Sequence, residues 1–361
     1  MTACAKKETD YPKFNVIGHM QTDYAEKFMV EYCDDGCSLI DIDGEKFLLV
    51  PENADIPSYA ENVEIIRQPV KNIYLAATSA MDLFDALGAL DEVTMTSTDI
   101  DGWSLPNVQK AIQAGNLNYV GKYSTPDYEA LTELDCGIAI ESTMINHSPD
   151  TKEQLKLLGI PVLTEQSSYE SHPMARLEWI KLYGLLIGKS EEAEKYFNEK
   201  KQEFEALTVN DISESEKKTA AFFYLSSNGY VNIRKPGDYI SKMIELAGGK
   251  YIFTADGLNV DDNALSTMNI QLEEFYETAK DADIIIYNST IEGELDDLDQ
   301  FLNLSPVFAD LRAVKEGNVW CTEKNMFQQT TGVSDMIADL ELIFTGKADD
   351  KDDLTFLHRL K

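Results

Sequence analysis

Pairs of small hydroxyl residues follow four apolar runs, two in each half of the chain. Serine and threonine side chains donate and accept hydrogen bonds, so they could hold a polar ligand. They also suit turns, which is the alternative explanation for any single pair. Because the arrangement recurs in both halves, it indicates a ligand held between two similar lobes. The pairs are Thr78 with Ser79, Ser142 with Thr143, Ser226 with Ser227, and Ser289 with Thr290.

Aromatic and arginine side chains near the expected strand ends could complete such a site. Arg176 and Arg234 lie at expected loop or helix-start positions, and guanidinium groups recognise carboxylate or catecholate oxygens in paired hydrogen bonds. Arg176 could equally form a surface ion pair with Glu178, and each aromatic residue could equally belong to the core. Flat aromatic side chains together with cationic guanidinium groups predict a large ligand that is anionic or of mixed polarity. The aromatic candidates are Trp103, Tyr123, Tyr169, Tyr224, Tyr230 and Phe327.

Three ligand chemistries remain open at this point. Haem iron requires an axial ligand, for which Met81, Tyr123 and His172 are the candidates. Catecholate chelates would use Arg176 and Arg234, whereas corrinoids could be held mainly by the aromatic side chains. The residue types alone do not choose among these three.

The cysteines and histidines give little support for a catalytic or metal centre. Cys33 and Cys37 flank a predicted turn and could form a disulfide, whereas Cys136 and Cys321 lie in apolar surroundings typical of core thiols. A metal-cluster or nucleotide oxidoreductase would need these cysteines to converge, or a phosphate loop that no motif reveals. A zinc- or manganese-binding lipoprotein would need several imidazoles, and the four histidines lack ligand spacing. We therefore expect no catalytic residue, metal or cofactor. The oxidoreductase and the zinc- or manganese-binding lipoprotein remain as alternatives.

Alternating strand and helix patterns must position these residues. Short apolar runs between helical segments predict parallel strands buried on both faces, with ligands beyond their carboxyl ends. The fold class expected is α/β, with two Rossmann-like lobes around a cleft. Residues 38–50 predict a β-hairpin, and a stiff helix at 190–207 would join the lobes and limit their closure. The expected divisions are a tether at 1–13, an N-terminal lobe at 14–170, a helical segment at 171–208 and a C-terminal lobe at 209–361.

Size and charge narrow the classes of partner. The chain has 361 residues, enough for two domains, and a formal net charge of −33. Such an acidic protein repels nucleic acid and anionic lipid headgroups, because binding phosphates requires dense Lys and Arg. No segment approaches the roughly 20 apolar residues that cross a bilayer. We expect no nucleic-acid partner and no membrane contact beyond a lipid anchor.

The N-terminus contains a candidate for that anchor. Thr2, Ala3 and Cys4 form a small-residue-then-cysteine pattern like a bacterial lipobox, and a polar stretch follows. The alternative is a chance cysteine near a frayed terminus. Together with the expected fold, the pattern predicts lipidation of Cys4 and a location on the outer face of the cytoplasmic membrane.

Almost the whole chain resembles the substrate-binding lipoproteins of bacterial ABC importers for iron chelates, haem and cobalamin. The resemblance implies two lobes joined by one rigid helix and delivery of the ligand to a permease powered by a separate ATPase. It implies binding without catalysis, and we expect a monomer. The residues that carry it are Thr78-Ser79, Leu87-Gly88-Ala89, Gly121 to Glu129, Leu158 to Val162, Ala247 to Phe253, Asp281 to Ile286 and Leu311 to Val319.

The resemblance also implies docking to permease arginines through one carboxylate on each lobe. The matching segments assign this role to Glu153 and Glu292, with the neighbouring Asp150 and Glu294 as competitors. The hairpin region at 33–50 departs from the smallest members of the family. It could decorate the lobe or shape the entrance for the ligand.

Overall fold

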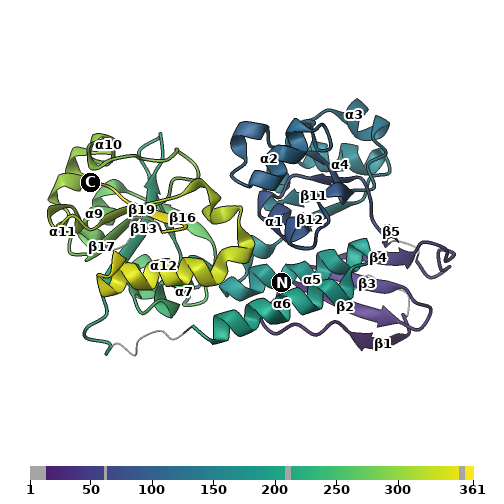
Figure 1. Cartoon of the computed structure of the whole chain (residues 1–361), viewed down its shortest axis with the longest axis horizontal. Coiled ribbons are helices and arrows are strands. Elements are labelled where there is room, and N and C mark those ends of the chain that lie inside the picture. Colours follow the sequence, from purple (N-terminus) through teal and green to yellow (C-terminus); the bar gives the residue numbers. More distant parts are fainter. Residues whose placement is uncertain (1–13, 61–62, 208–212, 349–353) are drawn as a thin grey trace, which may run out of the picture.

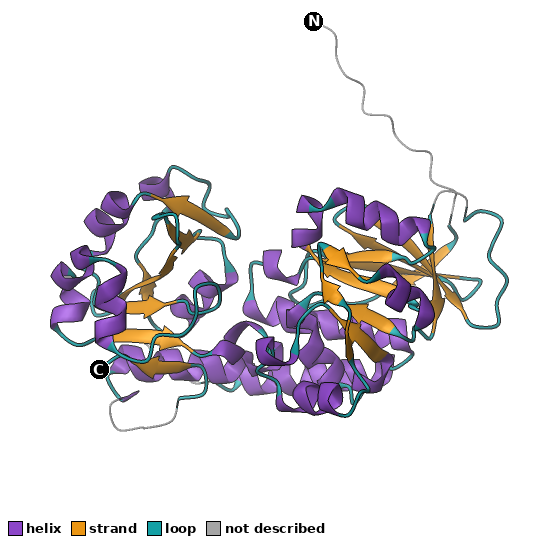
Figure 2. Ribbon diagram, turned by 90° about the horizontal axis from the view of Figure 1, so that it is seen from above, coloured by secondary structure: helices purple, strands orange, loops and turns teal. Residues whose placement is uncertain are grey.

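The computed structural model describes residues 14–60, 63–207, 213–348 and 354–361, and shows two α/β lobes (Figure 1). Cys4 and the expected tether at 1–13 lie outside the described residues. Each lobe has its own central sheet with helices around it, and the two sheets are separate (Figure 2). The expected fold class is therefore confirmed.

The N-terminal lobe contains a parallel sheet of order β12-β11-β6-β7-β8. Strands β6, β7, β11 and β12 are short runs that are mostly buried, as the sequence predicts, whereas the edge strand β8 is partly exposed. The strands are β6 (Ile73–Leu75), β7 (Val93–Thr96), β8 (Asn118–Tyr119), β11 (Ile138–Ser142) and β12 (Val162–Glu165), beside the small hairpin β9 (Gly121–Lys122) and β10 (Thr125–Pro126). The helices are α1 (Thr78–Ala86), α2 (Pro106–Gln113), α3 (Tyr128–Glu133) and α4 (Pro149–Leu157), with 3-10 turns η1 (Leu90–Glu92), η2 (Ile100–Gly102), η3 (Thr143–His147) and η4 (Ser167–Tyr169).

A further sheet precedes this lobe, and the sequence predicted only its hairpin. The hairpin at 38–50 is the antiparallel pair β3 and β4, inside a sheet of order β1-β2-β3-β4-β5. One face packs on the main core through Phe28, Ile40 and Phe47, and the other covers a small cluster around Leu48. The strands are β1 (Val16–His19), β2 (Phe28–Cys33), β3 (Ser38–Ile42), β4 (Glu45–Pro51) and β5 (Glu64–Gln68).

The C-terminal lobe contains a mixed sheet of order β16-β14-β13-β17-β18-β19, in which β15 also pairs with β13. Strands β13, β17 and β18 are parallel neighbours, whereas β14 pairs antiparallel with both β13 and β16, and β19 pairs antiparallel with β18. The strands are β13 (Thr219–Leu225), β14 (Val231–Arg234), β15 (Lys250–Tyr251), β16 (Thr267–Ile270), β17 (Ile284–Tyr287), β18 (Val319–Thr322) and β19 (Leu357–Arg359). The helices are α7 (Tyr239–Leu246), α8 (Ala255–Leu258), α9 (Leu272–Ala279), α10 (Leu298–Leu304), α11 (Arg312–Lys315) and α12 (Val333–Thr345), with η5 (Pro306–Asp310), η6 (Lys324–Phe327) and η7 (Thr330–Gly332).

The helix that leads from the N-terminal lobe to the C-terminal lobe packs against a second, antiparallel helix. The helix expected at 190–207 is α6 (Ser190–Glu205), and it packs along α5 (Pro173–Ile187). Gly184 permits this close packing, because a Cβ at that position would lie 2.4 Å from the Ala193 side chain. Helix α5 is buried along its whole length and contacts α1 of one lobe and α7 and α12 of the other. One continuous core therefore runs through both lobes.

Within the described residues, none of the helices has the length and apolar character needed to cross a membrane.

Candidate functional site

A cavity of about 180 Å³ lies at the carboxyl ends of β13 and β17 in the C-terminal lobe. We call it the cleft cavity. Its lining includes four predicted ligand-binding residues, Tyr224, Arg234, Thr290 and Phe327, which are far apart in the sequence. No sequence motif marks the other lining residues, which are two amides, one hydroxyl residue and one aliphatic residue. They are Asn232, Thr267, Asn288 and Ile291.

Arg234 is held among aromatic rings at the wall of the cleft cavity. Its guanidinium carbon lies 5.1 Å from the centre of the Phe327 ring and 5.8 Å from that of Phe222. Its Nη1 lies 3.5 Å from Asp238 Oδ2, and the other Asp238 oxygen accepts a hydrogen bond from the Ile240 N–H at 3.0 Å. Stacking and pairing restrict the side chain, so Arg234 is a fixed cationic group rather than a mobile surface one.

Amide and hydroxyl groups give the cleft cavity its remaining polarity. Asn288 Oδ1 accepts hydrogen bonds from Thr290 N at 3.1 Å and Thr290 Oγ1 at 2.6 Å. Asn232 Nδ2 donates to Asn269 Oδ1 at 2.8 Å across β14 and β16. The cavity thus combines one guanidinium group, neutral polar groups and two aromatic walls. This combination suits reversible binding of a ligand with both polar and flat apolar parts.

The cleft cavity lies beside a contact between the two lobes. Residues 323–332, which we call the interlobe loop, follow β18 and include Phe327. Gln328 Nε2 donates to the Gly102 carbonyl at 2.7 Å, and Gln328 Oε1 accepts from the Ser104 N–H at 2.8 Å. Because Gly102 and Ser104 belong to the N-terminal lobe, the loop brings Phe327 to the boundary between the lobes.

Two further hydrogen bonds fix the end of the interlobe loop on α1. Thr330 Oγ1 donates to the Ser79 carbonyl at 2.7 Å, and the Thr331 N–H donates to Asp82 Oδ2 at 2.7 Å. Burial raises the pKa of the Asp82 carboxyl, while the bonds from Thr331 lower it. The loop therefore couples the position of one lobe to that of the other.

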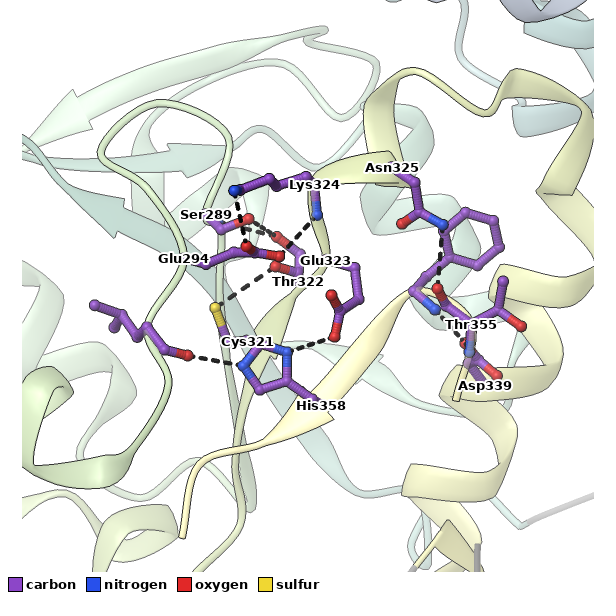
Figure 3. Close-up of polar contacts among 12 residues, drawn as sticks. Ser289, Glu294, Cys321, Thr322, Glu323, Lys324, Asn325, Asp339, Thr355 and His358 are labelled. Atoms are coloured by element: carbon purple, nitrogen blue, oxygen red, sulfur yellow. Dashed lines mark hydrogen bonds and ion pairs between the residues drawn. The ribbon is translucent and has the colours of Figure 1, made fainter. Parts of the chain in front are cut away.

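The start of the interlobe loop is fixed by the C-terminal strand (Figure 3). His358 on β19 contacts Glu323 Oε1 through Nδ1 and the Leu295 carbonyl through Nε2, both at 2.7 Å. The neighbouring Cys321 side chain, and then the Leu295 carbonyl and the Glu323 carboxylate, raise the pKa of His358 to about 10. The protonated ring can donate to both oxygens. Asn325 adds a bond to the Thr355 carbonyl at 3.2 Å.

Arg176 does not line the cleft cavity. It is buried at the junction of α5 and α7, where its guanidinium carbon lies 4.2 Å from the centre of the Tyr239 ring. Glu165, at the end of β12, is also buried and interacts electrostatically with Arg176. The surface ion pair with Glu178 is not formed, because Glu178 faces the N-terminal sheet instead. Arg176 therefore joins the lobes at their base.

A second cavity, of about 390 Å³, lies at the carboxyl ends of β11 and β12. We call it the hairpin pocket because Asp43, in the turn between β3 and β4, forms part of its wall. It brings together two predicted residues, Thr143 and Tyr169. The other lining residues are Lys27, Met144, Asn146, His147 and Gln166.

Four of the predicted ligand-binding residues lie outside both cavities, in the core or in hydrogen bonds within the fold. Met81 and Trp103 lie in the core, and Trp103 Nε1 donates to the Thr98 carbonyl at 3.1 Å. Ser289 is buried and hydrogen-bonded to Thr322. His172 caps α5 by accepting from the Met174 N–H at 3.2 Å, and burial lowers its pKa to about 4. The positions of Met81 and His172 do not support the suggestion that either ligates haem iron.

The remaining candidates lie near strand ends but outside both cavities. Thr78 and Ser79 begin α1, and Ser142 ends β11 and caps η3. Tyr123 packs on the small core cluster of the N-terminal lobe, while Tyr230 is 40% exposed in the turn before β14. A ligand role for these five residues stays a prediction.

The two predicted docking carboxylates lie on different lobes. Glu153 is exposed on α4, and Glu292 follows β17 and accepts a hydrogen bond from the Ser227 N–H at 3.1 Å. The competitor Glu294 pairs with Lys324 at 3.4 Å. Their contact with a permease stays a prediction.

The four cysteines that the structure describes do not converge on a common centre. Cys33 and Cys37 lie in the N-terminal sheet, Cys136 precedes β11, and Cys321 belongs to β18 of the other lobe. Among the described residues, no three cysteine, histidine or acidic side chains are arranged to hold a metal ion.

A family model described as periplasmic binding protein matches residues 74–325 of the chain. An uncharacterized lipoprotein of Methanocaldococcus jannaschii is 26% identical over 300 residues, which are 80% of this chain and 69% of that protein. A periplasmic haem-binding protein from Pseudomonas aeruginosa shares the fold with a TM-score of 0.62 at 17% identity, covering 81% of this chain and 98% of that one. The petrobactin-binding protein from Bacillus subtilis gives a TM-score of 0.56 at 16% identity, covering 77% and 93%.

Proposed function

The chain belongs to the periplasmic binding protein family, and from that premise we propose that it captures a metal chelate or corrinoid for an ABC importer. Members of this family bind substrates for transport and are not enzymes, so the oxidoreductase alternative is set aside. The observation that carries the proposal is the cleft cavity of the C-terminal lobe, which brings Arg234, Tyr224 and Phe327 together beside the interlobe loop. The bound ligand would pass to a membrane permease.

The chemistry of the cavity favours a chelate with flat, oxygen-bearing groups. Arg234 can meet a catecholate or carboxylate oxygen, while Tyr224 and Phe327 can stack against an aromatic or macrocyclic plane. The solved structures similar in fold include proteins whose names state haem, vitamin B12 and petrobactin as ligands. At their low identities these names supply only the set of compounds to test.

Titration with a ferric catecholate siderophore, haem and cobalamin tests the proposal. We expect one of the three to bind, and we expect Arg234→Met and Phe327→Ala each to weaken that binding about tenfold or more, because each removes a wall of the cavity. Isothermal titration calorimetry measures the dissociation constant. Arg67→Met is the matched control, since Arg67 is exposed on β5, lies outside the lining of the cleft cavity and bonds the Ala54 and Pro51 carbonyls.

Two results would count against the proposal. One is that none of the three compounds binds, although the protein is folded and its thermal unfolding is cooperative. The other is equal affinity in the Arg234 and Phe327 variants and the control.

We propose further that Cys4 carries the lipid that holds the protein on the outer face of the cytoplasmic membrane. The lipobox-like residues support this, as does the lipoprotein name of the archaeal relative. When the chain is expressed behind a lipoprotein signal, we expect wild type to enter the detergent phase of Triton X-114 and Cys4→Ala to stay in the aqueous phase. Cys136→Ala is the control, because that thiol lies between α3 and β11. Equal partitioning of wild type and Cys4→Ala would refute the anchor.

A further inference from the structure

Two buried carboxylates fix the segment that leads into β2. The Glu178 oxygens accept the N–H groups of Asp23, Tyr24 and Ala25 at 2.8, 2.7 and 2.8 Å. The Glu170 oxygens accept those of Glu26 and Lys27, each at 3.0 Å. Hydrogen bonds to ionised acceptors are stronger than neutral ones, so this segment is held firmly on the lobe. It lies outside residues 74–325, the part matched by the family model.

The hydrogen bonds to Glu170 and Glu178 hold Lys27 in the wall of the hairpin pocket. The backbone of Lys27 is fixed by Glu170, and its side chain is half-buried. Asp43 joins it from the turn between β3 and β4, where its φ of +50° is one that asparagine and aspartate tolerate. The N-terminal sheet thus contributes two charged residues to a pocket whose other walls belong to the α/β lobe.

Hydrogen-bond donors dominate the lining of the hairpin pocket. The Lys27 ammonium group lies within ion-pairing distance of no carboxylate in the described ranges, although the chain is strongly acidic. Tyr169, Asn146 and Gln166 offer further N–H or O–H donors, and His147 offers a ring nitrogen. Asp43 is the one acidic side chain in the lining. Within the described residues Glu170 interacts electrostatically with the Lys27 ammonium group but forms no direct ion pair with it. Such a group beside neutral side chains that can donate hydrogen bonds suits a carboxylate on the ligand.

We propose that the N-terminal sheet completes a second binding position on the first lobe, the hairpin pocket, which receives a carboxylate group of the transported ligand through Lys27 and Tyr169. The inference rests on the proposed function, because it assigns this pocket to the same binding event. It gives the additional sheet a role in ligand selection. Ligands carrying a free carboxylate arm would be favoured over uncharged ones of the same shape.

Citrate is a suitable probe, because it presents carboxylates without a metal or an aromatic plane. We expect calorimetry to show citrate binding to the full chain, with affinity reduced about tenfold in Lys27→Gln and reduced to a smaller degree in Tyr169→Phe. Lys110→Gln is the matched control, because Lys110 is exposed on α2 and absent from the pocket lining. Uncharged glycerol should not bind at the same concentrations.

Several outcomes overturn the inference. If citrate fails to bind at tens of millimolar, or binds equally to Lys27→Gln and wild type, the hairpin pocket is not a carboxylate-binding site. The same follows if citrate binding is lost in Arg234→Met but kept in Lys27→Gln, because the anion would then occupy the cleft cavity. Failure of the proposed function looks different, since citrate would still bind through Lys27 while the siderophore, haem and cobalamin did not.

Discussion

Replacing Glu178 with alanine should lower the free energy of unfolding by about 3–5 kcal/mol, the usual cost of removing one partner from a buried ion pair. Glu178 is 0% exposed, accepts three backbone N–H groups and lies 3.1 Å from the ammonium group of Lys181, which is 3% exposed. The substitution leaves the donors of Asp23, Tyr24 and Ala25 without their acceptor. Urea denaturation followed by circular dichroism measures the loss.

The loss should be concentrated where the N-terminal sheet meets α5. Hydrogen exchange should become faster in residues 16–33 of Glu178→Ala, because that segment loses its bonds to α5. Glu192→Gln is the control, since Glu192 is exposed in the first turn of α6. A loss below about 1 kcal/mol, or exchange that is faster only in the C-terminal lobe, would contradict the role assigned to Glu178.

Replacing Glu141 with glutamine should stabilise the protein at high pH and change little at low pH. Glu141 is 0% exposed on β11, and neither carboxyl oxygen has a hydrogen-bond partner within the described part of the chain. Burial raises the pKa of its carboxyl to about 8, while Lys152 acts in the opposite direction. The folded protein therefore holds a proton that the unfolded chain releases near pH 4.5.

The sign of the pH dependence follows from that proton. Below about pH 4.5 both states are protonated, so Glu141 contributes no ionisation penalty. As the pH rises towards 8 only the unfolded state ionises, which lowers the stability of the folded state. Above pH 8 the penalty is complete and on the order of 5 kcal/mol.

Urea denaturation of wild type and Glu141→Gln at pH 5 and pH 9 measures this difference. The free energy of unfolding of Glu141→Gln should exceed that of wild type by several kcal/mol more at pH 9 than at pH 5. Glu129→Gln should show no such difference, because Glu129 is exposed on α3. An advantage that is equal at both pH values would mean that Glu141 is ionised in the folded state throughout.

The sequence by itself determined the strand–helix alternation of both lobes, because buried parallel strands are apolar runs that can be recognised locally. It also placed the hydroxyl pairs at strand ends and the helix that became α6. These features depend on periodicity and turn chemistry within a few residues. The hairpin at 38–50 was equally local, since Asp43-Gly44 specifies the turn between β3 and β4.

Only the tertiary structure decided which side chains meet. Tyr224, Arg234, Thr290 and Phe327 converge because β13, β14 and β17 are neighbours in one sheet and the interlobe loop returns to it. Met81 belonged to the right helix but to its core face, which helical spacing in a largely apolar helix does not distinguish.

The N-terminal sheet and the pairing of α5 with α6 also required the folded chain. Glu170 and Glu178 look like ordinary surface acids in the sequence, and their function appears only when five backbone N–H groups are brought to them. Long-range contacts of this kind leave no local pattern, because their energy comes from burial and partner geometry rather than from neighbouring residues.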